Sequence, residues 1–384
     1  MKEWSPAKKW NPFNSYKLLS QVYRWRHIER EKAIPQPALV TIDPINKCNL
    51  RCDWCNAEYM LKENNRMLSR DTLMDLADFL PRWQGSQEWP AGVEAICIAG
   101  GGEPLLHPDI GPFIERAVAN GIEVGVVTNG TNLDELLEPL SKCTWVGVSV
   151  DAGTAATFQR LKQVDCFERI LDNIQQLTAY AAAHDCCLGS GRAGYGVSYK
   201  YLLTPDNIED IVPAARLAKR LGCTNFHLRP ASVAWDKLSA HKPTLFHNGE
   251  DMRLEAAIET VRPLEDETFG VYGITHKFGS DLNPANGFNH CHALFMTCVV
   301  MPPRDETRER FRLGLCCDRR GDLRLEATEV GSSVEEIADF WGSGNHWAIF
   351  DTIDLADCPR CTYQPHNQIM EHVILEDSMT YKFI

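Results

Sequence analysis

Three closely spaced cysteines are the residues of this sequence best suited to chemistry. Cys48, Cys52 and Cys55 follow a Cys-x3-Cys-x2-Cys spacing. Three thiolates from one loop can bind three irons of a cubane iron–sulfur cluster and leave the fourth iron open for another ligand. A structural zinc site instead favours four protein ligands, usually as paired Cys-x2-Cys units. The spacing therefore predicts a 4Fe–4S cluster with one open coordination position.

A second group of cysteines lies toward the end of the sequence. Its members are Cys291, Cys316, Cys317, Cys358 and Cys361. By ligand type alone, four thiolates suit either tetrahedral zinc or a second cubane cluster. Adjacent strand residues point to opposite faces, so only one residue of the 316–317 pair should be a ligand. We predict that the four metal ligands of this group are Cys291, Cys316, Cys358 and Cys361.

The segments that must position the first three cysteines alternate between strand-like and helix-like patterns. Strand patterns span residues 38–42, 93–99, 124–128, 145–150, 197–203 and 226–228, and helix patterns span 68–79, 110–120, 133–141, 167–183 and 208–221. This alternation predicts parallel βαβ units with right-handed crossovers. Six units are too few for a closed eight-stranded barrel, so we predict an α/β fold, a partial (β/α)6 TIM-like barrel. Functional residues in such folds gather at the carboxyl ends of the strands.

The same pattern divides the chain into four regions. Residues 1–37 are predicted to be an N-terminal extension, 38–230 the barrel, 231–285 a connecting region on the substrate side, and 286–384 a small C-terminal domain held by metal.

Composition and charge exclude several classes of protein. With 384 residues, 44% of them hydrophobic and 24% charged, the chain is neither disordered nor of low complexity. A net charge of −13 argues against a generally basic nucleic-acid-binding protein. No stretch approaches about 18 consecutive apolar residues and no signal peptide is evident, so we expect no membrane span and a cytoplasmic location. In that reducing compartment the 15 cysteines should be thiols rather than disulfides.

Taken together, these features resemble the radical S-adenosylmethionine (SAM) superfamily over about residues 38–230. Gly100-Gly101-Gly102-Glu103-Pro104 follows the second strand pattern, as the Gly-Gly-Glu-Pro motif does in that family. Residues 128–130 and 149–151 end the third and fourth strand patterns. The resemblance implies that SAM binds the open iron and is reductively cleaved to a 5′-deoxyadenosyl radical, which abstracts a hydrogen atom from the substrate.

The resemblance also implies which side chains contact SAM. Gly101 and Gly102 would let the backbone approach the methionine end of SAM, and Glu103 would accept a hydrogen bond from its ammonium group. The other candidates are Trp54, Asn129, Ser149 and Asp151. A purely structural role stays open for these residues, because a glycine run or an Asn-Gly pair also forms ordinary turns. Further candidates are Ser198, Lys200, His227 and Arg229, which could face the barrel interior or form internal salt bridges.

The C-terminal cysteines resemble the auxiliary-cluster (SPASM or twitch) domain found in some radical SAM enzymes. In that domain a β-hairpin lies between the first two ligands, here expected from residues 311–315 and 323–325, and a helix, here 333–341, precedes the Cys-x2-Cys pair. No cysteine follows Cys361, which favours one auxiliary 4Fe–4S cluster rather than two. With four thiolate ligands that cluster has no open iron and would carry electrons.

The resemblance implies a radical SAM oxidoreductase or isomerase. Its substrate would be a small polar molecule, namely a sugar, aminocyclitol, nucleoside or amino-acid unit, and its architecture is similar to that of aminocyclitol dehydrogenases. An external one-electron reductant such as flavodoxin or ferredoxin would be a partner. The first alternative is a maturase of ribosomal peptides, although residues 1–37 are too short for a winged-helix peptide-recognition domain. A second is modification of a base in nucleic acid, against which the net charge argues. A non-enzymatic metal-binding protein would leave the Gly-Gly-Glu-Pro motif unexplained.

Overall fold

A single curved sheet of nine strands organises the protein. The structure is a computed structural model, and it describes residues 14–55, 57–61, 66–192, 194–231, 250–273, 287–358 and 361–375. The strands are β1 (Leu39–Ile42), β2 (Ala95–Ile98), β3 (Glu123–Thr128), β4 (Trp145–Ser149), β5 (Gly196–Leu203), β6 (Asn225–Pro230), β7 (Gly270–Gly273), β8 (Thr297–Met301) and β9 (Arg312–Gly314). Their order across the sheet is β7-β6-β5-β4-β3-β2-β1-β8-β9, and all neighbours are parallel except β8 and β9.

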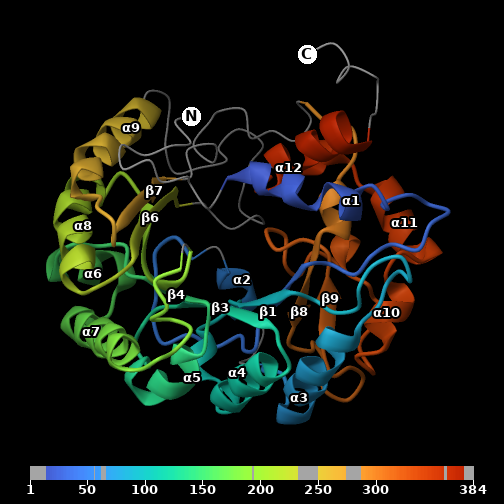
Figure 1. The fold of residues 1–384 in the computed structure, drawn as a ribbon, viewed down its shortest axis with the longest axis horizontal. Helices are drawn as coiled ribbons and strands as arrows, with labels where there is room; N and C mark the ends of the chain where they lie inside the picture. Colours follow the sequence, from blue (N-terminus) through green and yellow to red (C-terminus); the bar gives the residue numbers. More distant parts are fainter. Residues whose placement is uncertain are drawn as a thin grey trace.

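Helices cover the outer side of this sheet. They are α3 (Arg70–Phe79), α4 (Ile110–Ala119), α5 (Leu137–Ser141), α6 (Ala155–Lys162), α7 (Phe167–Ala183), α8 (Ile211–Arg220) and α9 (Glu250–Val261). The short helix α2 (Glu58–Leu61) lies apart from them, within the curve of the sheet in Figure 1. Figure 1 shows α4–α8 along the convex side of the curved sheet. The predicted partial barrel is confirmed, and its strands and longer helices lie within a few residues of the predicted bounds. None of the described helices is long and apolar enough to cross a membrane.

Alternating side chains give the sheet two different faces. In β4, Val146 and Val148 are fully buried and belong to the core shared with the helices. Trp145 and Ser149 point the other way, into the barrel interior, and are only partly buried. The helices supply matching apolar stripes, such as Ile170 and Ile174 one turn apart in α7.

Two glycines make room for large side chains on the interior face. A Cβ atom at Gly125 would lie 2.2 Å from the ring of Trp145 on the neighbouring strand. A Cβ atom at Gly147 would lie 2.1 Å from Cε of Lys200. Lys200 therefore lies flat across β4, with Nζ 5.2 Å from the centroid of the Trp145 ring. The interior of this part of the barrel is thus filled by an aromatic ring and a cation.

The C-terminal region continues the barrel sheet. Strand β8 pairs in parallel with β1, and β9 pairs with β8. The predicted hairpin is wrong in its second strand, because residues 323–325 form a 3-10 helix and only a single bridge joins Gly314 to Glu326. Helices α10 (Glu336–Phe340), α11 (Gly344–Thr352) and α12 (Gln364–Ile369) complete the region.

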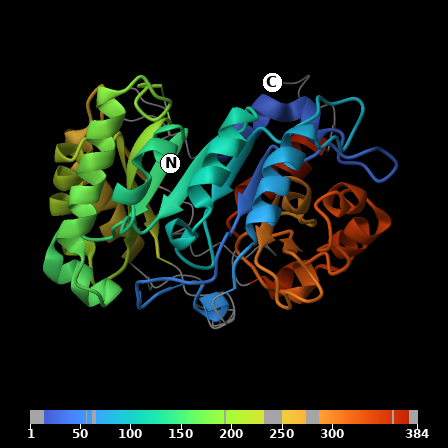
Figure 2. The same cartoon turned by 90° about the horizontal axis from the view of Figure 1, so that it is seen from below.

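One hydrophobic core joins the C-terminal region to the barrel. The ring of Trp341 meets that of Trp83 edge to face, with centroids 5.4 Å apart, and its Nε1 donates to the carbonyl of Pro35 over 2.9 Å. The N-terminal α1 (Val22–Trp25) also packs here, and Figure 2 shows the C-terminal elements in red beside the blue N-terminal segment. Of the predicted connecting region, residues 232–249 and 274–286 lie outside the described residues.

Removing the C-terminal region should unfold the barrel. A chain ending at residue 286 would leave β1 as an open edge and expose the core side chains that pack against Phe295, Phe311 and Trp341. Each such side chain contributes about 1.5–3 kcal/mol, so the loss of several is comparable with the usual stability of about 5–15 kcal/mol. Circular dichroism during heating, with the full chain as control, should show no cooperative transition. A soluble truncated barrel that melts cooperatively would contradict this.

Candidate functional site

The first cysteine loop, residues 43–55, lies between β1 and α2 at the carboxyl edge of the sheet. Cys48, Cys52 and Cys55 are all free thiols and only partly exposed. Burial raises the pKa of Cys48 to about 11, and the nearby charges of Cys52 and Cys55 act in the same direction. The three thiols are therefore near enough to influence one another electrostatically, and their role as ligands of one cluster stays a prediction.

The glycine run after β2 packs against the backbone of this loop. A Cβ atom at Gly102 would lie 2.3 Å from the carbonyl oxygen of Lys47, a distance that no side chain tolerates. The next residue, Glu103, donates its backbone N–H to the same carbonyl over 2.7 Å. At Gly101 an added Cβ would lie 2.8 Å from Oδ1 of Asn46 and 3.0 Å from Met60. The glycines are therefore required here for close packing.

Glu103 is a buried carboxylate that receives three hydrogen bonds. Its Oε1 accepts from Thr128 Oγ1 over 2.6 Å and from the backbone N–H of Leu105 over 3.0 Å, and its Oε2 accepts from the N–H of Asn129 over 2.6 Å. Burial raises the pKa of Glu103 to about 7, even though these hydrogen bonds lower it. Among the described residues, these bonds leave one acceptor position of Oε2 for a further donor.

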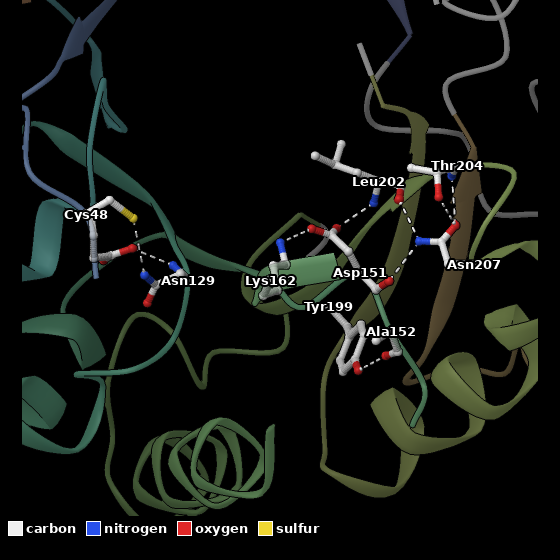
Figure 3. Close-up of polar contacts among 10 residues, drawn as sticks. Cys48, Asn129, Asp151, Ala152, Lys162, Tyr199, Leu202, Thr204 and Asn207 are labelled. Carbon is white, nitrogen blue, oxygen red and sulfur yellow. Dashed lines mark hydrogen bonds and ion pairs between the residues drawn. The ribbon is translucent and has the colours of Figure 1, made fainter. Parts of the chain in front are cut away.

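Asn129 joins the end of β3 to the first cysteine loop. Its Nδ2 donates to Oδ1 of Asn49 over 2.7 Å and lies 3.9 Å from Sγ of Cys48 (Figure 3). Asn49 in turn donates to Oγ1 of Thr131 over 2.8 Å. The structure thus brings Glu103 and Asn129 together with Cys48.

Asp151 lies apart from Asn129 and Cys48. In Figure 3 it is on the opposite side from Cys48 and Asn129 and is surrounded by its own partners. Its carboxylate forms an ion pair with Lys162 and accepts from the N–H of Leu202 over 2.6 Å, while its carbonyl accepts from Asn207 over 2.8 Å. With φ at +62°, Asp151 adopts the left-handed region. Its side chain therefore has a structural role, and direct contact with SAM stays an untested prediction.

Lys162 is a site residue that sequence reasoning missed. It ends α6, and its carbonyl accepts from the N–H of Arg51 over 3.1 Å. Its Nζ lies 5.6 Å from the ring centroid of Trp54, the predicted adenine neighbour. Burial lowers the pKa of Lys162, but Asp151 and the thiols of Cys52 and Cys48 raise it more, so the ammonium stays charged. No sequence signal pointed to Lys162, because α6 was not predicted.

A second missed residue is Asn46. Its side chain is fully buried beside Gly101, and neither of its amide atoms has a hydrogen-bond partner among the described residues. Buried amides are normally satisfied. An unsatisfied one beside the glycine run is what a site for a polar cofactor group requires. The signal was available, since Asn46 stands two residues before the first cysteine of the motif.

Ser149 begins a polar row on the interior face. It pairs with Lys200 of β5, Lys200 pairs with His227 of β6, and His227 pairs with Tyr272 of β7. Paired residues of a sheet point to the same face, so these four side chains line the interior together. Arg229 follows on the same face, two residues beyond His227.

The four-cysteine group, which consists of Cys291, Cys316, Cys358 and Cys361, gathers in the C-terminal region. Burial raises the pKa of Cys361 well above its usual range, and the other three thiols act in the same direction. Nδ2 of Asn367 lies 3.9 Å from Sγ of both Cys291 and Cys361. The guanidinium of Arg319 donates to Sγ of Cys358 over 3.2 Å. Four converging thiols with cationic and amide donors suit an iron–sulfur cluster, whose sulfurs accept hydrogen bonds.

Cys317 points away from the four-cysteine group, toward the barrel. It packs against Met60, Val299 and Met301, and its Sγ lies 3.0 Å from the hydroxyl of Tyr363. The structure thus separates Cys316 from Cys317 in the predicted way, although the ligand assignment itself stays a prediction.

The segment after Cys317 also reaches the barrel interior. The guanidinium of Arg320 pairs with the buried carboxylate of Asp43, directly after β1, with Nε 2.5 Å from Oδ2. Burial raises the pKa of Cys97 on β2 to about 11, and the charges of Lys200 and Arg320 oppose that rise. These two cations, from β5 and from the C-terminal region, therefore lie near one thiol of the interior face.

The comparisons with known proteins start from a family model. Residues 42–191 match the model of the Radical SAM superfamily. Molybdenum cofactor biosynthesis protein 1 of Homo sapiens is 28% identical over 173 residues, which cover 41% of this chain and 26% of that protein. The mycofactocin maturase MftC of Mycobacterium tuberculosis is 26% identical over 219 residues, which cover 56% of this chain and 50% of that protein. The chain thus spans half or less of these two curated relatives.

A solved structure extends the comparison beyond the matched segment. SuiB of Streptococcus suis, crystallised with the precursor peptide SuiA, has a TM-score of 0.55 and 14% sequence identity to this chain. The match covers 89% of this chain and 74% of that one. At this level of identity the likeness shows a shared fold alone.

The ion pair between Asp151 and Lys162 should be critical for stability. Asp151→Asn leaves a buried ammonium without its counter-charge, which should lower the free energy of unfolding by about 3–5 kcal/mol. Adding Lys162→Met should recover most of that loss. Glu115→Gln, which breaks the exposed pair with Lys142, should cost less than about 1 kcal/mol. Urea unfolding gives the free energy of unfolding of each variant. Equally small losses of this free energy for both ion pairs would contradict the prediction.

Proposed function

We propose that this protein is a radical SAM enzyme that oxidises, epimerises or rearranges a polar substrate inside the barrel. Residues 42–191 match the model of the Radical SAM superfamily, whose cofactors are a 4Fe–4S cluster and SAM. The observation that carries the proposal is the close backbone packing of the loop that contains Cys48, Cys52 and Cys55 against the glycine run and Glu103. The four-cysteine group fits the auxiliary 4Fe–4S cluster.

When bound, the cluster and SAM supply a 5′-deoxyadenosyl radical that abstracts hydrogen from the substrate, and the auxiliary cluster supplies a one-electron carrier. The residues of this chain bind and orient these groups. Cys48, Cys52 and Cys55 would hold three irons, and the charge of Lys162 opposes the rise that burial causes in the pKa of Cys55. The backbone of Gly101 and Gly102 borders the methionine end of SAM. The remaining SAM contacts are assigned to Glu103, Asn129, Ser149 and Trp54.

Glu103 and Asn46 are suited to the amino-acid end of SAM. The free acceptor position of Glu103 Oε2 can receive an N–H from the amino group of SAM, and the unsatisfied amide of Asn46 can bind a carboxylate or an amino group. Both side chains are buried, so water competes poorly for them. Asp151 then acts indirectly, since its ion pair fixes Lys162 and the loop that carries the cysteines.

The interior row supports a polar substrate. Lys200, His227 and Tyr272 lie side by side on β5–β7, and Arg229 follows beyond them. Cationic and hydrogen-bonding groups in a barrel interior suit hydroxyl, carboxylate or phosphate groups. A sugar or aminocyclitol unit fits that lining. Among these reaction classes, net oxidation is favoured by the position of the four-cysteine group. Cys317, the neighbour of Cys316 in sequence, packs against Met60, and Met60 lies beside Gly101. The four-cysteine group is therefore close to the glycine run.

A peptide substrate is the second candidate. One matched relative is named a maturase, and the solved structure of SuiB holds a precursor peptide. A peptide side chain would enter the same interior and meet the same polar row. Cytoplasmic location and an external reductant such as flavodoxin or ferredoxin complete the proposal.

The catalytic assignment can be tested by SAM cleavage. After anaerobic reconstitution, the triple variant Cys48→Ala/Cys52→Ala/Cys55→Ala should form no 5′-deoxyadenosine in the presence of dithionite, and its iron should fall from about eight to about four per chain. Cys143→Ala is the matched control, because Cys143 is a buried core thiol and its variant should retain about eight irons. Cleavage by the triple variant would refute the core assignment.

The substrate class can be tested with the intact enzyme. A dialysable metabolite fraction and a peptide fraction from cells grown in deuterium oxide are each incubated with the enzyme and SAM. The fraction that transfers deuterium into 5′-deoxyadenosine contains the substrate. Transfer from the peptide fraction alone would refute the small-molecule proposal in favour of a maturase.

The raised pKa of Glu103 predicts a pH-dependent affinity for SAM. Its pKa is raised from the usual 4.5 to about 7, so the carboxylate is mostly protonated at pH 6 and mostly charged at pH 8. If the charged form binds SAM, affinity should rise about tenfold over that interval, because the charged fraction rises from about one-tenth to about nine-tenths. Equilibrium dialysis of the reconstituted protein measures the affinity for SAM at both pH values. Glu103→Gln should remove this rise, and an unchanged rise in that variant would exclude Glu103 as its cause.

A further inference from the structure

Two histidines and a glutamate meet on the outer side of the four-cysteine group. His290 and His292 flank Cys291 in sequence, and Glu371 lies in the helical segment Met370–Leu375 that follows α12. One potential ligand atom from each of the three lies within 4.8 Å of the other two. None of these residues has a part in the proposed reaction.

The spacing of these atoms matches neither a hydrogen bond nor a water bridge. Oε2 of Glu371 lies 3.6 Å from Nδ1 of His290 and 3.6 Å from Nε2 of His292. A direct N–H···O hydrogen bond spans about 2.7–3.2 Å, and two such bonds through one water separate the outer atoms by about 4.5 Å. Ligand bonds of about 2.0–2.1 Å in tetrahedral zinc sites place neighbouring ligand atoms about 3.3 Å apart. The observed distances are closest to this last value.

His292 provides an independent observation. Its side chain is only 10% exposed, and neither of its ring nitrogens has a hydrogen-bond partner among the described residues. A buried imidazole with two unsatisfied nitrogens is unfavourable. A metal ion bound to Nε2 would satisfy the nitrogen that faces Glu371.

Glu371 is already oriented for such a role. Its two carboxylate oxygens accept from the backbone N–H of Asn289 over 2.9 and 3.0 Å, Oε1 accepts from Nδ2 of Asn289 over 2.6 Å, and Oε2 accepts from the N–H of His290 over 3.1 Å. These bonds fix the carboxylate with Oε2 toward both imidazoles. Hydrogen bonds that orient a ligand in this way are typical of metal sites.

We propose that His290, His292 and Glu371 bind a divalent transition metal ion, with Zn²⁺ as the best fit, and that water occupies the fourth position. Two imidazoles and one carboxylate form a ligand set that zinc accepts while keeping one open position. The ion would tie the segment of Cys291 to the helical segment that follows Asn367, whose amide contacts two of the four thiols. It therefore clamps the four-cysteine group from outside and takes no thiolate.

Metal analysis of the holoprotein tests the proposal. The chain with both clusters reconstituted is incubated with Zn²⁺, freed of unbound metal by gel filtration and analysed for zinc and iron by mass spectrometry. The wild type should carry about one zinc per chain beside about eight irons. His290→Ala should lose the zinc and keep the iron, because His290 is 58% exposed and its removal leaves the core intact. His184→Ala, at another exposed histidine, is the matched control and should keep both metals.

Zinc-edge diffraction locates the ion. Anomalous density between the two imidazoles and Glu371 supports the proposal. Zinc retained in full by His290→Ala, or a wild type that binds none, overturns it. Anomalous density on the thiols of Cys291 and Cys361 also overturns the proposal. That result would at the same time contradict the assignment of an auxiliary cluster. A protein that binds iron but does not cleave SAM would instead count against the proposed function, and this result would not affect the proposed zinc site.

Discussion

A buried ion pair between Lys162 and Asp151 holds together the parts of the site that are far apart in sequence. Lys162 ends α6, whose last two carbonyls accept from the backbone N–H groups of Arg51 and Asp53 in the first cysteine loop. Asp151 follows β4, and its second oxygen accepts from Leu202 of β5. Because neither charge is exposed to water, separating them would leave each one unsolvated in the interior. The spacing of the three thiols therefore depends on a contact in which none of them takes part.

Close packing of backbone against backbone is the second constraint. Gly102 touches the carbonyl of Lys47, so the turn after β2 and the first cysteine loop form one surface without side chains between them. Glu103 is held at the rim of this surface by Thr128, Asn129 and Leu105. Among the described residues, the buried carboxylate and the unsatisfied amide of Asn46 then remain as polar groups that can accept a ligand. Rigid packing on one side and unsatisfied polar atoms on the other are what a pre-organised binding site needs.

The sequence was most informative where patterns are long or where spacing itself has chemical meaning. The buried strands of the barrel are short apolar runs that alternate with amphipathic helices, and Ser69 caps α3 by accepting from the N–H of Thr72. The segment Ala155–Lys162 was missed because its pattern is short, so Lys162 was missed with it. Strand β7 contains two glycines in four residues, so its sequence is typical of a turn. Strand β8 was hidden because the nearby cysteines suggested a domain held by metal. The interior polar row depends on strand register, which a single sequence does not specify.

The pairing of β8 with β1 also has a consequence for how the protein is made. The first strand of the barrel is translated early, but the neighbour that covers its outer edge comes from the last quarter of the chain. Until the ribosome has released that segment, β1 presents an unpaired row of backbone groups of the kind that promotes aggregation. The motif that carries Cys48 directly follows this edge. Delivery of iron and sulfur to the nascent chain, and protection by a chaperone during that interval, would therefore act on the same few residues.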